Sequence, residues 1–261
     1  MTPADPREMF DLTGRSILIT GATGALGSEA ARALAAAGAR LTVVGGNAEA
    51  LTALAAELPA GSCVTVPRRA TSPAEAEAMV AAAIDAFGRL DGVVVASGLN
   101  KVAPIVDMDV ADWDEVMDGN VRATWLVCQA AGRVLVPQGR GSVVLISSAR
   151  GKLGHPNGYS AYSPSKAAVD LLAKTLAAEW GPRGVRVNSI APTVFRSDLT
   201  AWMYADDEQS RTVREGFLTR IPLKRLSEPS DLVGPIVFLL SDASVFVTGH
   251  VLYADGGYTA C

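Results

Sequence analysis

The stretch Ser16-Ile-Leu-Ile-Thr-Gly-Ala-Thr-Gly-Ala-Leu-Gly27 decides the fold of this 261-residue chain. A short apolar run ends in a turn with three glycines, and an alanine-rich segment then continues to Gly38. Glycines between a strand and a helix let backbone N–H groups and the helix N-terminus approach a pyrophosphate without interference from a Cβ. The stretch therefore predicts a strand–turn–helix unit that binds a dinucleotide; the alternative is a tight turn without a ligand.

The rest of the chain repeats the alternation of strand and helix. Asn47 is a predicted helix cap, and Ser72-Pro73-Ala-Glu75 combines a capping box with proline at the first helical position. The predicted strands are Ser16–Thr20, Leu41–Val44, Cys63–Val66, Gly92–Ala96, Gly141–Ile146, Val185–Ile190 and Val251–Ala254. Alternation of apolar, β-branched strands with helices predicts a parallel sheet covered on both faces. We expect one doubly wound α/β domain over residues 1–261.

Composition narrows the functional class. The net charge is −4, with 19% charged and 49% hydrophobic residues and no basic stripe, so we expect neither a nucleic-acid nor a membrane partner. The three cysteines, Cys63, Cys128 and Cys261, are scattered, which predicts free thiols in a reducing cytoplasm and no metal site. The N-terminus has no apolar signal core, and no apolar run reaches transmembrane length.

Candidate catalytic residues lie in the middle of the chain. Tyr162 and Lys166 are four residues apart, so on a helix they share one face. A neighbouring ammonium is expected to lower the pKa of a phenol, which would make it a general acid/base. Ser148 follows an apolar run fourteen residues before Tyr162, and Asn120 lies further upstream. Together with the glycine turn, this set indicates a hydride-transferring oxidoreductase.

These residues resemble the short-chain dehydrogenase/reductase family, in its single-domain branch, over nearly the whole chain. Further matches to family patterns are Leu90-Asp91-Gly92, Ser147-Ser148, Tyr162-Ser-Pro-Ser-Lys166, Val187-Asn-Ser-Ile-Ala-Pro192, Ile221-Pro-Leu and Thr248-Gly. The resemblance implies a seven-stranded Rossmann-type sheet and NAD(P)-dependent oxidation of an alcohol or reduction of a ketone.

The resemblance also implies a role for each catalytic residue. Tyr162 would exchange a proton with the substrate oxygen, and Lys166 would lower its pKa and bind the nicotinamide ribose. Ser148 would hold the substrate oxygen, with Ser147 as its rival, and Asn120 would belong to a water relay. The implied cofactor-binding set is Gly21, Thr23, Gly24, Leu26, Gly27, Gly46, Ala96, Gly98, Tyr162, Lys166, Pro192 and Phe195. The implied substrate-binding set is Ser148, Tyr162, His155 and Trp202.

The chain departs from the family pattern around the cofactor. The departures are Ala25 in the glycine turn, Val95-Ala-Ser-Gly98 after the fourth strand, Arg69 near the adenine, Thr193 and Phe195. An acid at the end of the second strand would repel a 2′-phosphate, but this chain has Gly45-Gly46-Asn47 there, neither acid nor base. We therefore favour NADP over NAD, although no basic residue at this position attracts it.

Residues 193–221 interrupt the alternation with aromatic and charged side chains. They follow the sixth strand, where ligands bind in such sheets, so we expect a substrate lid; an ordinary pair of surface helices is the alternative. The expected substrate is a small secondary alcohol or ketone of sugar-alcohol, sugar-acid or 3-oxoacyl type. Arg196, His155 and Asn157 are candidate anchors for a polar or anionic group. A catalytically silent dinucleotide-binding sensor or scaffold is the alternative function.

Two predicted helices, Val121–Leu135 and Ala167–Trp180, suggest an oligomer. Their expected outer surfaces are apolar and comprise Trp125, Val127, Val169, Leu172 and Leu176. Exposed apolar patches usually mark interfaces, and related enzymes pair these helices, so we expect a homotetramer, with a dimer as the alternative. The C-terminal Tyr258–Cys261 would then lie near a neighbouring subunit. The other reading is that these apolar residues pack inward on the sheet.

Overall fold

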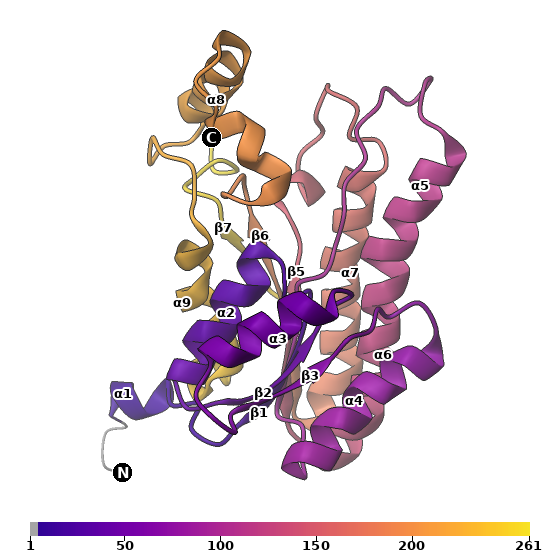
Figure 1. Cartoon of the computed structure of the whole chain (residues 1–261), viewed down its shortest axis with the longest axis vertical. Helices are drawn as coiled ribbons and strands as arrows, with labels where there is room; N and C mark the ends of the chain where they lie inside the picture. Colours follow the sequence, from indigo (N-terminus) through magenta and orange to yellow (C-terminus); the bar gives the residue numbers. More distant parts are fainter. Residues whose placement is uncertain (1–4) are drawn as a thin grey trace.

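A parallel seven-stranded sheet forms the centre of the protein, in a computed structural model that describes residues 5–261, with side chains undescribed at positions 6, 198 and 199. The strands lie in the order β3-β2-β1-β4-β5-β6-β7. Figure 1 shows the sheet in the middle of the molecule with helices around it. Their bounds are β1 Ser16–Thr20, β2 Arg40–Val44, β3 Cys63–Val66, β4 Gly92–Val95, β5 Gly141–Ile146, β6 Val185–Pro192 and β7 Val251–Ala254. The order reverses between β1 and β4, and ligands of doubly wound sheets bind beyond the carboxyl ends of the strands at such a point.

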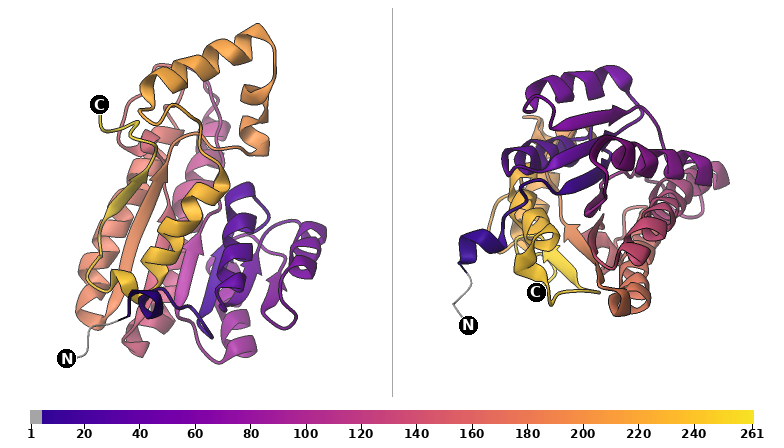
Figure 2. Two further views of the ribbon diagram at one scale, coloured as in Figure 1. Left: turned by 90° about the vertical axis from the view of Figure 1, so that its left-hand side faces the viewer. Right: turned by 90° about the horizontal axis from the view of Figure 1, so that it is seen from below.

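Helices cover both faces of the sheet (Figure 2). One face packs against α4, α6 and α7 and the other against α2, α3 and α9, because apolar side chains of these helices form two separate buried clusters with the strands. The α-helices are α1 Pro6–Met9, α2 Ala25–Ala36, α3 Ala48–Glu57, α4 Pro73–Phe87, α5 Val110–Met117, α6 Ala123–Gln138, α7 Tyr162–Trp180, α8 Glu208–Arg220 and α9 Val233–Leu240. The predicted doubly wound α/β fold is confirmed.

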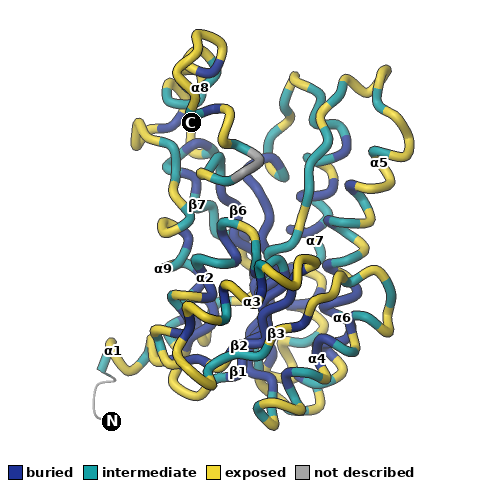
Figure 3. Tube along the Cα trace, in the orientation of Figure 1, coloured by how far each residue is buried: buried dark blue, intermediate teal, exposed yellow. Residues whose placement is uncertain are grey.

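The strands form the most deeply buried part of the molecule (Figure 3). All five residues of β1 and all four of β4 are buried, as expected for central parallel strands covered on both faces. All seven predicted strands are present, and β6 continues two residues beyond its predicted end, to Pro192. The main-chain pairing of β6 with β7 continues to that proline, which carries the strand to the edge of the ligand-binding end.

The segment after β6 lies beyond the carboxyl ends of the strands. It contains a short 3₁₀ segment, η4 (Asp198–Tyr204), followed by α8, which extends across the top of the molecule in Figure 2. Met203 of η4 is buried, and α8 is largely exposed. None of the described helices is both long enough and apolar enough to cross a membrane.

The prediction that five apolar residues of α6 and α7 face outward is wrong for four of them. Val127, Val169 and Leu176 are buried against the sheet, and Leu172 packs against the same core cluster. Only Trp125, 47% exposed, faces outward as expected. The sheet holds the two helices with these side chains turned inward, which helical periodicity alone does not determine. The homotetramer stays a prediction.

Candidate active site

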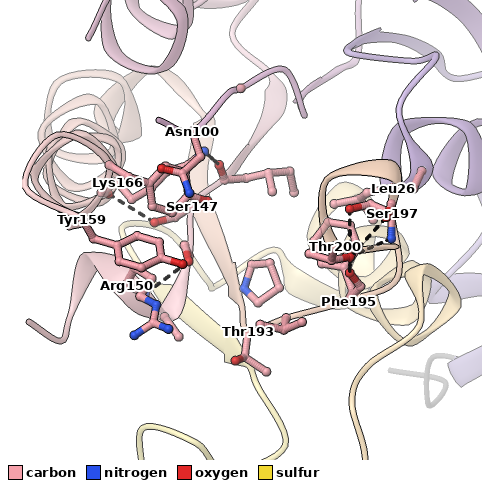
Figure 4. A pocket seen from close by; sticks show the side chains of 18 of the residues that line it. Leu26, Asn100, Ser147, Arg150, Tyr159, Lys166, Thr193, Phe195, Ser197 and Thr200 are labelled. Atoms are coloured by element: carbon pink, nitrogen blue, oxygen red, sulfur yellow. Dashed lines mark hydrogen bonds between the residues drawn. The ribbon is translucent and has the colours of Figure 1, made fainter. Parts of the chain in front are cut away.

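A cavity of about 950 Å³ lies at the carboxyl ends of β1, β4, β5 and β6. The structure brings most of the predicted site residues to its wall: Gly21, Gly24, Leu26, Gly27, Ala96, Gly98, Ser148, His155, Tyr162, Lys166, Pro192, Phe195 and Trp202. Thr23, Gly46 and Asn120 lie outside the lining. Figure 4 shows one side of the cavity formed by Ser147, Arg150, Tyr159 and Lys166, and the other by Leu26, Phe195, Ser197 and Thr200.

The glycine turn leaves room for a phosphate. Gly21 has φ +68°, and a Cβ there would lie 2.6 Å from the Ser97 backbone nitrogen, so only glycine fits. A Cβ on Gly27 would lie 2.8 Å from the carbonyl carbon of Gly21, which keeps α2 close to the turn. The N-terminus of α2 has no side-chain cap, and its first residues line the cavity. Unpaired N–H groups at a helix start bind anions, so this turn fits a pyrophosphate.

Ser148 is better placed than Ser147 to hold a substrate oxygen. The Ser147 hydroxyl donates to the main-chain oxygen of Lys166 at 3.2 Å and so is turned toward the backbone. The Ser148 hydroxyl accepts from the Arg150 N–H at 3.2 Å and hydrogen-bonds with the Tyr162 phenol. Ser148 and Tyr162 therefore form a pair on the cavity wall, as preferred from the sequence.

The expected lowering of the Tyr162 pKa by Lys166 does not occur in the protein alone. Burial raises the pKa of the Tyr162 phenol, and its hydrogen bond with Ser148 opposes that rise only in part. The Lys166 Nζ lies 5.7 Å from the centre of the Tyr162 ring and donates to the main-chain oxygen of Ile146 at 2.9 Å. The phenol therefore keeps its proton at neutral pH, the form that can protonate a carbonyl oxygen.

Lys166 is itself perturbed, because its ammonium is buried. Burial lowers the pKa of Lys166 to about 8, while Asp170 acts in the opposite direction. An unfolded lysine has a pKa of about 10.4. Between these two pKa values the unfolded chain binds more protons than the folded one. The contribution of Lys166 to the free energy of unfolding therefore becomes more favourable as the pH rises through this range.

We expect Lys166→Met to reveal this dependence. The free energy of unfolding of the wild type, relative to the variant, should increase between about pH 8 and about pH 10. Denaturant unfolding at several pH values measures it. Lys174→Met, which removes an exposed lysine from the same helix, is the control for loss of charge alone. A pH-independent difference between the wild type and Lys166→Met would contradict the expectation.

Asn120 holds the loop after β4 against α7. Its Oδ1 accepts from the Leu99 N–H at 2.8 Å, and its Nδ2 donates to the Leu99 carbonyl and the Ser165 hydroxyl, each at 2.9 Å. Asn120 lies in a single π-helical turn, η1 (Asp118–Arg122), between α5 and α6, and such turns occur often at functional sites. In this structure Asn120 is a positioning residue; the water relay stays a prediction.

A basic group does lie at the end of β2, contrary to the sequence interpretation. A Cβ on Gly46 would lie 3.1 Å from both Cζ and Nη2 of Arg69, and Nε is closer still. Arg69 follows β3, and the pairing of Val44 with Val66 brings it beside Gly46. Its neighbour Arg68 pairs with Glu75 at 2.7 Å, whereas no carboxylate among the described side chains pairs with Arg69. The sequence identified Arg69 as a departure from the family pattern, but it did not predict that the side chain points toward Gly46.

Two cationic residues of the cavity wall, Arg150 and Arg220, were not predicted from the sequence. The predicted anchor Arg196 is not part of the described wall: its guanidinium lies 4.0 Å from the centre of the Tyr204 ring and pairs with Glu228. The C-terminal segment was expected near a neighbouring subunit. Tyr258 is 2% exposed and lines the cavity of its own chain. The contact with a neighbouring subunit stays a prediction.

The amino-acid sequence is similar to those of known oxidoreductases. The profile of the family described as enoyl-(acyl carrier protein) reductase matches residues 21–259. An uncharacterized oxidoreductase of Mycobacterium tuberculosis is 61% identical over 97% of this chain and 94% of its own length. Galactitol 2-dehydrogenase (L-tagatose-forming) of Cereibacter sphaeroides is 37% identical, over 98% of this chain and 99% of its own.

Comparison with solved structures identifies the same kind of relative. The structure of a short-chain type dehydrogenase/reductase from Mycobacterium ulcerans matches with a TM-score of 0.90 and 36% identity, covering 96% of this chain and 91% of that one. The extent of these matches, with the glycine turn and the Ser148–Tyr162 pair in one cavity, leads to one conclusion: the chain belongs to the short-chain dehydrogenase/reductase family of oxidoreductases.

Proposed function

We propose that the protein is an NADP-dependent oxidoreductase that interconverts a small secondary alcohol and its ketone. The observation that carries the proposal is that Ser148, Tyr162 and Lys166 line the same cavity as the glycine turn. A proton donor and a phosphate-binding turn in one cavity are what hydride transfer to or from a carbonyl carbon requires. No metal enters the proposal.

The chain's own residues supply binding, orientation and a proton. The uncapped start of α2 would hold the pyrophosphate of a dinucleotide, which would supply the hydride-transfer chemistry. The Ser148 hydroxyl holds and polarises the substrate oxygen, which favours the charge that develops on it in the transition state. The Tyr162 phenol donates its proton to that oxygen during reduction and takes it back during oxidation. The buried Lys166 ammonium places a positive charge next to the phenol.

Arg69 supports NADP over NAD. Its guanidinium lies over Gly46, where the ribose hydroxyls of the adenosine would be bound, and an arginine nearby accommodates a 2′-phosphate. Arginine binds phosphate with two parallel N–H···O bonds, whereas an acid would repel it. The side chain comes from the end of β3 and fills the space that Gly46 leaves open.

Arg69→Ala should therefore change cofactor preference. We expect the dissociation constant of NADPH to rise about tenfold to a hundredfold, as for loss of a hydrogen bond to a charged group, and that of NADH to change little. Arg68→Ala removes an adjacent arginine that is already paired with Glu75, and it should leave both constants nearly unchanged. Fluorescence titration of both nucleotides measures this. Equal weakening of NADPH by the two variants would contradict a specific role for Arg69.

The proposed activity itself is tested in two steps. Binding of NADPH is measured first, and alcohols and ketones are then screened for a change in absorbance of the reduced nicotinamide. Turnover of a secondary alcohol or ketone supports the proposal. Tight binding of NADPH without turnover across a broad panel would favour the silent sensor.

A further inference from the structure

Arg150 is buried in the cavity wall and has no ion-pair partner among the described side chains. It lies in the short 3₁₀ segment η2 (Ala149–Gly151), directly after Ser148, and is 8% exposed. Its Nη1 is buried and has no hydrogen-bond partner. No ion pair among the described side chains includes this guanidinium. A buried charge without a partner costs several kcal/mol, so arginines in such places are normally paired.

Three aromatic rings surround this guanidinium. Its Cζ lies 4.8 Å from the centre of the Tyr159 ring, 5.5 Å from Phe217 and 5.9 Å from Tyr258. Such cation–π contacts offset part of the cost of burial, yet they leave the N–H groups without acceptors. The rings also fix the direction of the side chain, beside Tyr159 on the cavity wall (Figure 4).

The cavity is positively charged around Arg150. Its wall contains Lys166 and Arg220 as further cations, and none of the described lining residues is an aspartate or glutamate. Arg220 is the last residue of α8, and its Cζ lies 4.3 Å from the centre of the same Tyr258 ring that Arg150 contacts. A wall with cations and without anions attracts a negatively charged ligand and disfavours a positively charged one.

We propose that Arg150 binds a carboxylate of the substrate, so that the enzyme acts on a small hydroxy acid and the corresponding oxo acid. This inference rests on the proposed function and names the substrate class. Arginine presents paired N–H groups that match the two oxygens of a carboxylate. The carboxylate would supply the acceptor that Nη1 lacks and neutralise the buried charge.

Arg150 lies in the same cavity as the catalytic residues. Tyr159 neighbours both Arg150 and the catalytic phenol: the Arg150 Cζ lies 4.8 Å from the centre of its ring, and the centres of the Tyr159 and Tyr162 rings are 6.2 Å apart. Ser148, which pairs with that phenol, accepts a hydrogen bond from the Arg150 main chain at 3.2 Å. Ser148, Tyr162 and Arg150 line the same cavity, and the positive charge of Arg150 acts to lower the pKa of the Tyr162 phenol. One molecule in this cavity can therefore place its hydroxyl-bearing carbon at Ser148 and Tyr162 and its carboxylate at Arg150.

Paired ligands test the proposal without relying on turnover. Calorimetric titration of the NADPH-loaded protein compares three acids with neutral alcohols of the same carbon skeleton: L-lactate with propylene glycol, D-threonate with D-threitol, and D-gluconate with D-glucitol. We expect at least one acid to bind about tenfold or more tightly than its partner. Arg150→Met should remove this advantage, and Arg196→Gln, which changes an arginine outside the cavity wall, should keep it.

Stability measurements separate binding from a structural role. Because methionine removes an unpaired buried charge at similar volume, Arg150→Met should unfold at no lower denaturant concentration than the wild type. The proposal is overturned if no acid binds better than its neutral partner, or if Arg150→Met binds the acid as tightly as the wild type. An acid that binds through Arg150 but is never oxidised, with its oxo acid never reduced, would count against the proposed function and leave the carboxylate site in place.

Discussion

Tyr162→Phe is expected to lower the turnover number by about 10²–10⁴-fold, the usual contribution of a general acid or base. The variant loses only the phenolic oxygen, which hydrogen-bonds with Ser148 and carries the proton for the substrate oxygen. The glycine turn and the start of α2 are untouched, so the dissociation constant of NADPH should change little. Steady-state kinetics on a verified substrate, together with fluorescence titration of NADPH, measures both quantities.

Tyr253→Phe is the matched control, because it removes a phenolic oxygen from β7 outside the described cavity wall. Its turnover number should stay close to that of the wild type, because Tyr253 is not among the described lining residues of the cavity. Wild-type turnover by Tyr162→Phe would refute the assignment of the proton donor. If Tyr162→Phe lost NADPH binding as well as turnover, Tyr162 would be needed to maintain the structure of the site.

Gly27→Ala is expected to lose cofactor binding and stability together. Its Cβ would lie 2.8 Å from the carbonyl carbon of Gly21 and 2.9 Å from the Cα of Ala22. Both neighbours are backbone, so α2 must move away from the turn, at a cost of about 1–3 kcal/mol typical of overpacking. The displaced N–H groups no longer converge on one phosphate. We expect the dissociation constant of NADPH to rise at least about tenfold.

Gly24→Ala separates the two effects. Gly24 has φ −79° and ψ 163°, which alanine adopts freely, and its nearest neighbour would be the Gly21 oxygen at 3.4 Å. The free energy of unfolding should therefore stay within about 0.5 kcal/mol of the wild type. The added methyl group lies on the cavity wall, so NADPH binding should still weaken. If both variants bound NADPH as tightly as the wild type, the assignment of the glycine turn to the cofactor site would be wrong.

The sequence by itself determined the features that depend on neighbours along the chain. Apolar, β-branched runs that alternate with helical segments predicted all seven strands, because a buried parallel strand is apolar along nearly its whole length. The glycine turn and the Tyr162/Lys166 spacing predicted which residues meet one wall of the cavity. These patterns are local, since the period of a helix or strand and the φ of a turn are properties of adjacent residues.

Tertiary structure alone decided which distant side chains meet. Arg69 lies over Gly46 because β2 and β3 pair in parallel register, and no local pattern encodes the direction of its side chain. The same holds for Arg150, whose burial depends on Phe217 and Tyr258 from segments that fold back over the cavity. Packing against the sheet likewise turned Val127 inward, although a helix by itself leaves the choice of buried face open.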